Sequence, residues 1–274
     1  MPVFGLGTWK MGGERERNPD NDDSADIVAI RTAIELGVTH IDTAELYADG
    51  KAEELIAEAV QDYDRSELFI ISKVKWTNLK HDEILAACSR SLNRLKMEYL
   101  DMYVLHSYND EVPLQESMRA LDTLVDQGLV RSIGVCNFGV KHLAEAREYA
   151  RHPVVYDQVH YNLEFREPER AGLLEYCQNN DVLLAAWRPV RSLTSEIPDI
   201  LVKMSQKYGK TPVQIAINWL ISQENVVTLS KTRNIKHLKE NIGAVGWNMD
   251  PEDIELLRYE YPGQKDVSDA VPLE

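Results

Sequence analysis

Residues 37–50 read GVTHIDTAELYADG, a short apolar run that carries an aspartate and leads into a loop containing a tyrosine. Short runs rich in Val, Ile and Leu are typical of buried parallel strands. Asp42 stands where this strand should end, and Tyr47 follows in a loop that closes with Gly50. Because a carboxylate is seldom buried without a partner, the stretch predicts a strand whose end carries a paired, functional carboxylate.

Runs of the same kind recur along the chain. In order they are VFGLG, VTHIDTA, LFIISKV, YLDMYVLH, VRSIGVCNF, VVYDQVHY, VLLAAW and VVTLSK. Helical patterns with one apolar face lie between them, for example in residues 24–37, 81–96 and 112–128. In the first of these helices we expect Ser24 to cap the start and Gly37 to mark the end.

Eight strands alternating with helices imply a parallel sheet. No linker or low-complexity run divides the 274 residues, so we predict one α/β domain over residues 1–274, a (β/α)8 TIM barrel. A doubly wound open sheet is the alternative. The last crossover is long and should form two helical pieces split near Gly209 and Pro212, and residues 250–260 should form one further helix.

Composition limits the function classes. The formal net charge of -15 argues against a binder of nucleic acid or of anionic membranes, and no apolar run is long enough to span a bilayer. The start lacks the features of a signal peptide, and Cys88, Cys136 and Cys177 form no C-x-x-C pair, so we expect a reduced, cytoplasmic protein. Motifs for zinc, Walker A and Rossmann sites are missing, so we expect no metal.

Polar or aromatic side chains stand at the end of every predicted strand. Barrel enzymes build their active sites at the carboxyl ends of the strands. The residues at these ends are Trp9, Asp42, Lys73, His106, Asn137, Gln158, Trp187 and Lys231. Their similar spacing along the chain predicts that they share one rim of the barrel.

Four residues form a candidate catalytic group. Asp42, Lys73 and His106 end the second, third and fourth strands, and neighbouring strands lie ~4.8 Å apart. Tyr47 can fold back over them. A nearby ammonium should lower the pKa of the Tyr47 phenol, Asp42 should hold that ammonium, and His106 can donate a hydrogen bond to a substrate oxygen. Alternatively, these residues have no catalytic role: Asp42 only starts a turn, Lys73 extends its amine to the surface, and His106 is a hydrogen-bonded histidine of the core.

The motifs GLGTWK, HIDTAELY, GKAEELIAEAV, SKV, LH, GVCNF, YDQVHYN and SKTRNIKHLKENIGA follow one another along nearly the whole chain. In this order and spacing the sequence resembles the aldo-keto reductase family. The resemblance implies a (β/α)8 barrel and NAD(P)H-dependent reduction of an aldehyde or ketone. It implies Tyr47 as the general acid, Lys73 and Asp42 as its tuning pair, and His106 as the group that orients the carbonyl. We expect the protein to be monomeric or only weakly associating.

The same resemblance implies a cofactor site. Asn137 and Gln158 would bind the nicotinamide carboxamide, and Trp187 would stack on the nicotinamide ring. Lys231, Thr232 and His237 would hold the 2′-phosphate of NADPH. The remaining implied cofactor residues are Thr8, Trp9, Asp42, Cys136, Arg188, Val190, Ser192, Glu240 and Asn241. The implied substrate residues are Trp9, Tyr47, His106 and Ser107. Each of these roles has a structural alternative: Trp187 could be a core aromatic residue, Asn137 a helix cap, and the residues after Lys231 a solvated helix start.

The sequence departs from the family pattern at several positions. Ser107 replaces a common aromatic residue, which should widen the pocket, and Arg188 stands where serine is common. His237 replaces an arginine of some members, so NADPH is expected and NADH is possible. The family's N-terminal hairpin is not found, and a short C-terminal tail should leave the pocket open.

Two other functions remain to be weighed. One is a nicotinamide-binding sensor or accessory subunit of the same family with vestigial reductase activity. The other is an unrelated barrel enzyme such as an isomerase.

Overall fold

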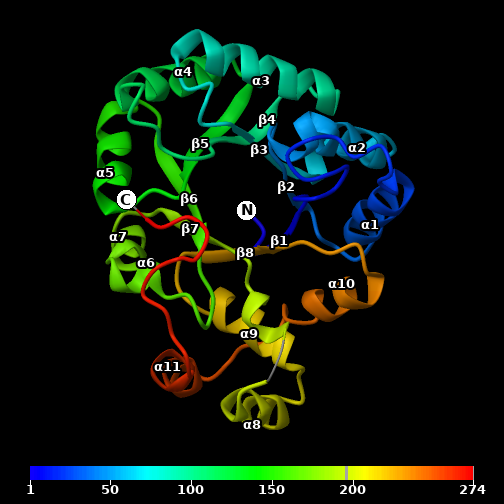
Figure 1. Ribbon diagram of the computed structural model, residues 1–274, viewed down its shortest axis with the longest axis vertical. Coiled ribbons are helices and arrows are strands. Elements are labelled where there is room, and N and C mark those ends of the chain that lie inside the picture. The colour runs from blue at the N-terminus through cyan, green and yellow to red at the C-terminus, as the bar shows by residue number, and fades with distance from the viewer. Residues whose placement is uncertain (195–196, 274) are drawn as a thin grey trace.

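Eight parallel strands close into a barrel in the computed structural model, which describes residues 1–194 and 197–273 (Figure 1). The strand order around the barrel follows the chain, and β8 pairs with β1. The strands are β1 (Phe4–Gly7), β2 (His40–Asp42), β3 (Phe69–Val74), β4 (Leu100–Leu105), β5 (Val130–Cys136), β6 (Val154–His160), β7 (Leu183–Trp187) and β8 (Val226–Ser230). The predicted TIM barrel is confirmed, and the open doubly wound sheet is wrong.

The register of the sheet decides which side chains enter the barrel. Asp42 pairs with Gly7 and with Ile71, and Lys73 pairs with Val104, all in parallel ladders. Because side chains alternate along a strand, residues two apart share a face. The buried cluster that fills the barrel includes Ile71, Met102, Val104, Cys136, Tyr156, Ala185 and Val227. Lys73 and Gln158 lie two positions beyond members of this cluster, so they point into the barrel at its carboxyl rim.

Helices surround the barrel, as Figure 1 shows. They are α1 (Asp23–Glu35), α2 (Lys51–Val60), α3 (His81–Leu95), α4 (Leu114–Asp126), α5 (Val140–Tyr149), α6 (Glu167–Arg170), α7 (Leu173–Asn179), α8 (Asp199–Tyr208), α9 (Pro212–Ile221), α10 (Ile235–Ile242) and α11 (Pro251–Glu260). Short 3₁₀ turns lie at Tyr47–Gly50, Arg65–Glu67 and Arg191–Thr194. Among these described helices, none is long and apolar enough to cross a membrane.

One helix boundary differs from the prediction. The cap of α1 is Asp22, whose side chain accepts a hydrogen bond from the Ala25 amide, so the expected cap at Ser24 is wrong. An aspartate two positions earlier serves equally well as a cap, and sequence patterns place helix ends only to within a few residues.

The long last crossover forms α8 and α9, as predicted. Gly209 ends α8 in the left-handed region at φ +62°, and Thr211 caps α9 with Pro212 in its first turn. The further helix predicted for residues 250–260 is α11.

The C-terminal segment then returns to the barrel. It forms a parallel bridge between Lys265 and Phe165, and the Ser268 and Leu273 amides both donate to the Glu167 carboxylate. This segment, red in Figure 1, passes beside β6 and β7.

Candidate active site

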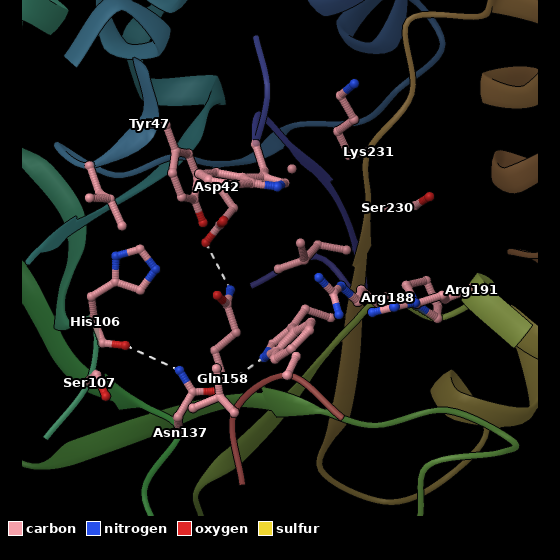
Figure 2. A pocket seen from close by; sticks show the side chains of 18 of the residues that line it. Asp42, Tyr47, His106, Ser107, Asn137, Gln158, Arg188, Arg191, Ser230 and Lys231 are labelled. Carbon is pink, nitrogen blue, oxygen red and sulfur yellow. Dashed lines mark hydrogen bonds between the residues drawn. The ribbon is translucent and has the colours of Figure 1, made fainter. Parts of the chain in front are cut away.

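A cavity of about 760 Å³ opens at the carboxyl rim of the barrel. Figure 2 shows side chains from several strand ends and loops around it. The residues that line it are Gly7, Trp9, Arg15, Asp42, Leu46, Tyr47, Trp76, His106, Ser107, Tyr108, Asn137, Gln158, Trp187, Arg188, Pro189, Val190, Arg191, Leu229, Ser230, Lys231, Ala270 and Val271. A cavity of this volume suits a small organic molecule together with part of a cofactor.

The four candidate catalytic residues meet at this cavity: Asp42, Tyr47 and His106 line it, and Lys73 is buried directly behind them. The Lys73 ammonium donates to Asp42 Oδ1 at 2.6 Å, to the Thr43 carbonyl at 2.8 Å and to the Tyr47 hydroxyl at 3.3 Å. The Tyr47 and His106 rings pack edge to face with their centroids 5.6 Å apart. Lys73 is fully buried, and a buried charge needs compensation. The Asp42 carboxylate, the Thr43 carbonyl and the Tyr47 hydroxyl provide it. The structure therefore brings together the phenol, ammonium, carboxylate and imidazole that the sequence predicted as one group.

Burial changes the titration of this group. It raises the pKa of the Tyr47 phenol to about 12, although Lys73 acts in the opposite direction. Lys73 therefore lowers this pKa, as expected, but burial of the phenol outweighs the effect because the phenolate loses its contact with water. Burial disfavours the ammonium of Lys73, but Asp42 outweighs it and raises the Lys73 pKa. Tyr47 is thus a protonated phenol at neutral pH, beside a permanent ammonium.

His106 is a neutral hydrogen-bonding group. Burial, followed by repulsion from Lys73, lowers the pKa of its imidazole to about 3. Its Nδ1 atom is buried and has no partner among the described residues. Its backbone carbonyl accepts a hydrogen bond of 3.2 Å from the Asn137 amide. A neutral imidazole whose ring faces the Tyr47 phenol can orient a carbonyl oxygen without delivering charge to it.

The amide side chains of Asn137 and Gln158 lie on the adjoining wall (Figure 2), which the Trp187 indole also lines. Gln158 Nε2 donates to Asp42 Oδ2 at 2.9 Å, and the Trp187 indole donates to Asn137 Oδ1 at 3.3 Å. Behind the cavity, the Trp187 ring stacks on the His160 ring with centroids 4.4 Å apart. The hydrogen bonds and the stack fix the orientation of the indole plane at the cavity wall.

Cations gather at the ends of β7 and β8. Arg188 and Arg191 both reach the Asp269 carboxylate, at 3.8 and 3.1 Å. Lys231 lines the same cavity just beyond β8, and among residues 1–194 and 197–273 it makes no ion pair. Such a group of cations can bind phosphate oxygens once Asp269 is displaced.

Several predicted cofactor residues lie away from the cavity wall. Thr8 is buried and donates to the Asp42 carbonyl, and Cys136 is buried in the barrel interior. The others lie on or before α10, beyond Lys231; these are Thr232, His237, Glu240 and Asn241. The side chain of Ser192 lies outside the described residues.

Other residues on the wall were missed by the sequence reasoning. Arg15, Leu46, Trp76 and Tyr108 come from loops, as do Ala270 and Val271 of the C-terminal segment, and Arg191 begins a 3₁₀ turn. Of these residues, only Trp76 could have been found by the pattern used above, because it is an aromatic residue just beyond the end of the third strand. The short C-terminal tail, which was expected to leave the pocket open, supplies Ala270 and Val271 to its wall.

Barrel, cavity and buried group together define an α/β-barrel protein equipped for proton transfer beside a ligand-binding cleft. A family model described as the aldo/keto reductase family matches residues 3–259. The chain belongs to the aldo-keto reductase family, a family of oxidoreductases.

Two bacterial reductases are similar to this chain over most of its length. Methylglyoxal reductase YeaE of Escherichia coli is 30% identical over 271 residues, which cover 97% of this chain and 93% of the relative. Glyoxal reductase of Bacillus subtilis is 31% identical over 259 residues, covering 94% and 88%.

Solved structures are also similar. A thermostable aldo-keto reductase in complex with the inhibitor epalrestat superposes with a TM-score of 0.91 at 42% identity, covering 94% of both chains. An aldo/keto reductase from Klebsiella pneumoniae in complex with NADP and acetate gives a TM-score of 0.85 at 31% identity, covering 100% of this chain and 96% of that one.

Proposed function

We propose that this protein is an NADPH-dependent reductase of aldehydes or ketones, with Tyr47 as the general acid. The observation that carries the proposal is the buried Lys73 ammonium, which bridges the carboxylate of Asp42 and the hydroxyl of Tyr47, two residues of the cavity wall. Membership of an oxidoreductase family supports the reaction class.

The cavity fits a nicotinamide dinucleotide. Trp187 offers a fixed aromatic plane for the ring, and the amides of Asn137 and Gln158 match a carboxamide. Arg188 and Lys231 place cations where phosphates would lie. Two aldo-keto reductase structures from Klebsiella pneumoniae contain NADP or NADPH, which supports the same choice here. Histidine at position 237 leaves NADH as a possible second cofactor.

When bound, the cofactor supplies a hydride to the carbonyl carbon of the substrate. The part of this chain is to handle the negative charge that develops on the carbonyl oxygen. Neutral His106 donates a hydrogen bond that orients this oxygen, and Tyr47 donates its proton to it. The Lys73 ammonium stabilises the phenolate that remains, and Asp42 holds the ammonium in place.

The test is the variant Tyr47→Phe, which removes one oxygen and keeps the ring. We expect turnover to fall by at least about 10²-fold, the usual worth of a general acid. The affinity for NADPH, measured by quenching of tryptophan fluorescence, should change less than about threefold. Retained turnover in this variant would rule out the mechanism.

The sensor alternative predicts a different result. In that case the wild-type protein binds NADPH tightly but oxidises it with no member of a carbonyl panel. The panel should include glyoxal and methylglyoxal, because two relatives are named for these substrates. It should also include sugars, aromatic aldehydes and keto acids.

We also propose a monomeric, cytoplasmic protein. Cys88, Cys136 and Cys177 are free, buried thiols, which supports a reducing compartment. Light scattering after size-exclusion chromatography should give a mass near 31.3 kDa. A mass of twice this value would refute the monomer.

A further inference from the structure

The charge on the cavity wall is opposite to that of the whole chain. The formal net charge is -15, yet the described residues on the wall include four cations, Arg15, Arg188, Arg191 and Lys231. Among the described residues that line the cavity, the only carboxylate is that of Asp42, which is already paired with Lys73. Cations concentrated in a cleft of an acidic protein attract an anionic ligand.

Three of these cations lie on the side proposed for the cofactor. Arg188 and Arg191 follow β7, and Lys231 follows β8. Arg15 comes from the loop between β1 and α1 and lies beside Trp76, which follows β3 on the far side of the barrel from β7. Arg15 is therefore not one of the cations proposed to bind the cofactor phosphates.

Arg15 is free to bind a ligand. Within residues 1–194 and 197–273, its side chain makes no hydrogen bond or ion pair. The carboxylate next to it in sequence, Glu14, is held by Lys10. The guanidinium carbon lies 5.8 Å from the centroid of the Trp76 ring, a cation–π contact that leaves its N–H groups available.

The backbone around Arg15 is fixed. The Asp49 backbone amide donates to the Arg15 carbonyl at 2.9 Å, and the Ala48 backbone amide donates to the Glu14 backbone carbonyl. Both donors follow Tyr47 directly, so the loop is tied to the segment that carries the proposed acid. The position of Arg15 relative to the reacting centre is thus set by the fold.

A chain of rings connects Arg15 to that centre. The Trp76 ring lies 6.4 Å from the His106 ring, and His106 lies 5.6 Å from Tyr47. A carbonyl held between Tyr47 and His106 would place the rest of its molecule along the Trp76 ring. The guanidinium then meets the end of the substrate that is farthest from the carbonyl.

We propose that Arg15 is a specificity residue that binds a carboxylate at this far end of the substrate. The inference rests on the proposed reductase function and narrows its substrate class to aldehydes or ketones with a flat apolar body and a distal carboxylate. Guanidinium is suited to this role because its fork of N–H donors matches a carboxylate in two places.

The experiment compares two aldehydes that differ only in charge, para-carboxybenzaldehyde and its neutral methyl ester. Each is assayed with the wild-type protein, with Arg15→Gln and with the control Arg17→Gln. Arg17 lies in the same loop, but its side chain pairs with Glu54 and is not on the cavity wall. Thermal melting checks that all three proteins are folded.

Wild type should prefer the carboxylate in kcat/KM. Arg15→Gln should raise KM for the carboxylate about tenfold, the scale of one charge-assisted hydrogen bond, with kcat nearly unchanged and the ester unaffected. Arg17→Gln should preserve the preference. Added salt should weaken the preference of wild type but not that of Arg15→Gln.

An unchanged ratio between the two aldehydes in Arg15→Gln would overturn the inference. Reduction of neither aldehyde would instead count against the proposed function. Calorimetric titration with the alcohol product, para-(hydroxymethyl)benzoate, then decides about Arg15 by itself. Equal affinity in wild type and Arg15→Gln, or binding to neither, would overturn the inference; weaker binding in Arg15→Gln alone would support it.

Discussion

Replacing Lys73 with methionine tests the electrostatic part of the mechanism. The side chains have similar length, so the change removes the charge and leaves an apolar chain in a fully buried place. Lys73 Nζ lies 3.3 Å from the Tyr47 hydroxyl oxygen. Two unit charges at this separation interact by about 5 kcal/mol at an effective dielectric constant of about 20.

Only part of this energy affects the rate. If the Tyr47 proton is about half transferred in the transition state, the loss is about 2.5 kcal/mol, which is about 10²-fold in rate. We therefore expect Lys73→Met to slow carbonyl reduction by this factor. NADPH affinity should change little, because Lys73 is not on the cavity wall.

The substitution also leaves the Asp42 carboxylate without its cation. Removing one partner of a buried ion pair costs about 3–5 kcal/mol of stability, so a slow variant could simply be unfolded. The double variant Asp42→Asn with Lys73→Met removes both charges and should recover much of this stability. If the mechanism is right, it should remain about as slow as Lys73→Met.

The assay is a single turnover with NADPH bound beforehand, followed by its loss of absorbance after mixing with an aldehyde. Thermal melting is measured on the same samples. A folded double variant that reduces the aldehyde within about threefold of the wild-type rate would refute the role given to Lys73.

The buried histidines, the Asp269 carboxylate and the close contact at Gly5 can each be perturbed separately. Burial lowers the pKa of His40 to about 4 and of His106 to about 3, from an ordinary 6.5. The stability that these neutral rings contribute is present above pH 6.5 and is lost as the pH falls toward 4, so the melting temperature should fall in that window; a flat melting temperature there would contradict this. Asp269→Ala should tighten NADPH binding severalfold in a fluorescence titration, because it frees Arg188 for phosphate; weaker binding would argue that Asp269 only holds the tail. Gly5→Ala should cost about 1–3 kcal/mol in denaturant unfolding, since its Cβ would lie 2.4 Å from the buried His40 ring; an unchanged midpoint would show that the ring can move.

Much of the site was readable at the strand ends. Asp42, Lys73 and His106 end consecutive parallel strands, and the closed sheet brings consecutive ends together. Once the barrel was inferred, their proximity followed from the spacing between strands. The same reasoning placed Asn137, Gln158 and Trp187 on one wall, where the structure has them.

Loop residues were not readable in this way. Arg15, Trp76 and Ala270 line one cavity although they lie far apart in the chain. Loop conformation depends on hydrogen bonds to distant segments, such as the bond from Asp49 to the Arg15 carbonyl, and has no periodic signature.

The sequence alone determined the barrel and its ring of polar strand ends, because hydrophobic periodicity is local and a parallel sheet with short crossovers has few arrangements. Only the tertiary structure decided the sign of the shift in the Tyr47 pKa, and only it showed that Arg15 makes no ion pair with the other described residues. Both depend on how much water and which charges surround a group, and these are fixed when distant segments pack together.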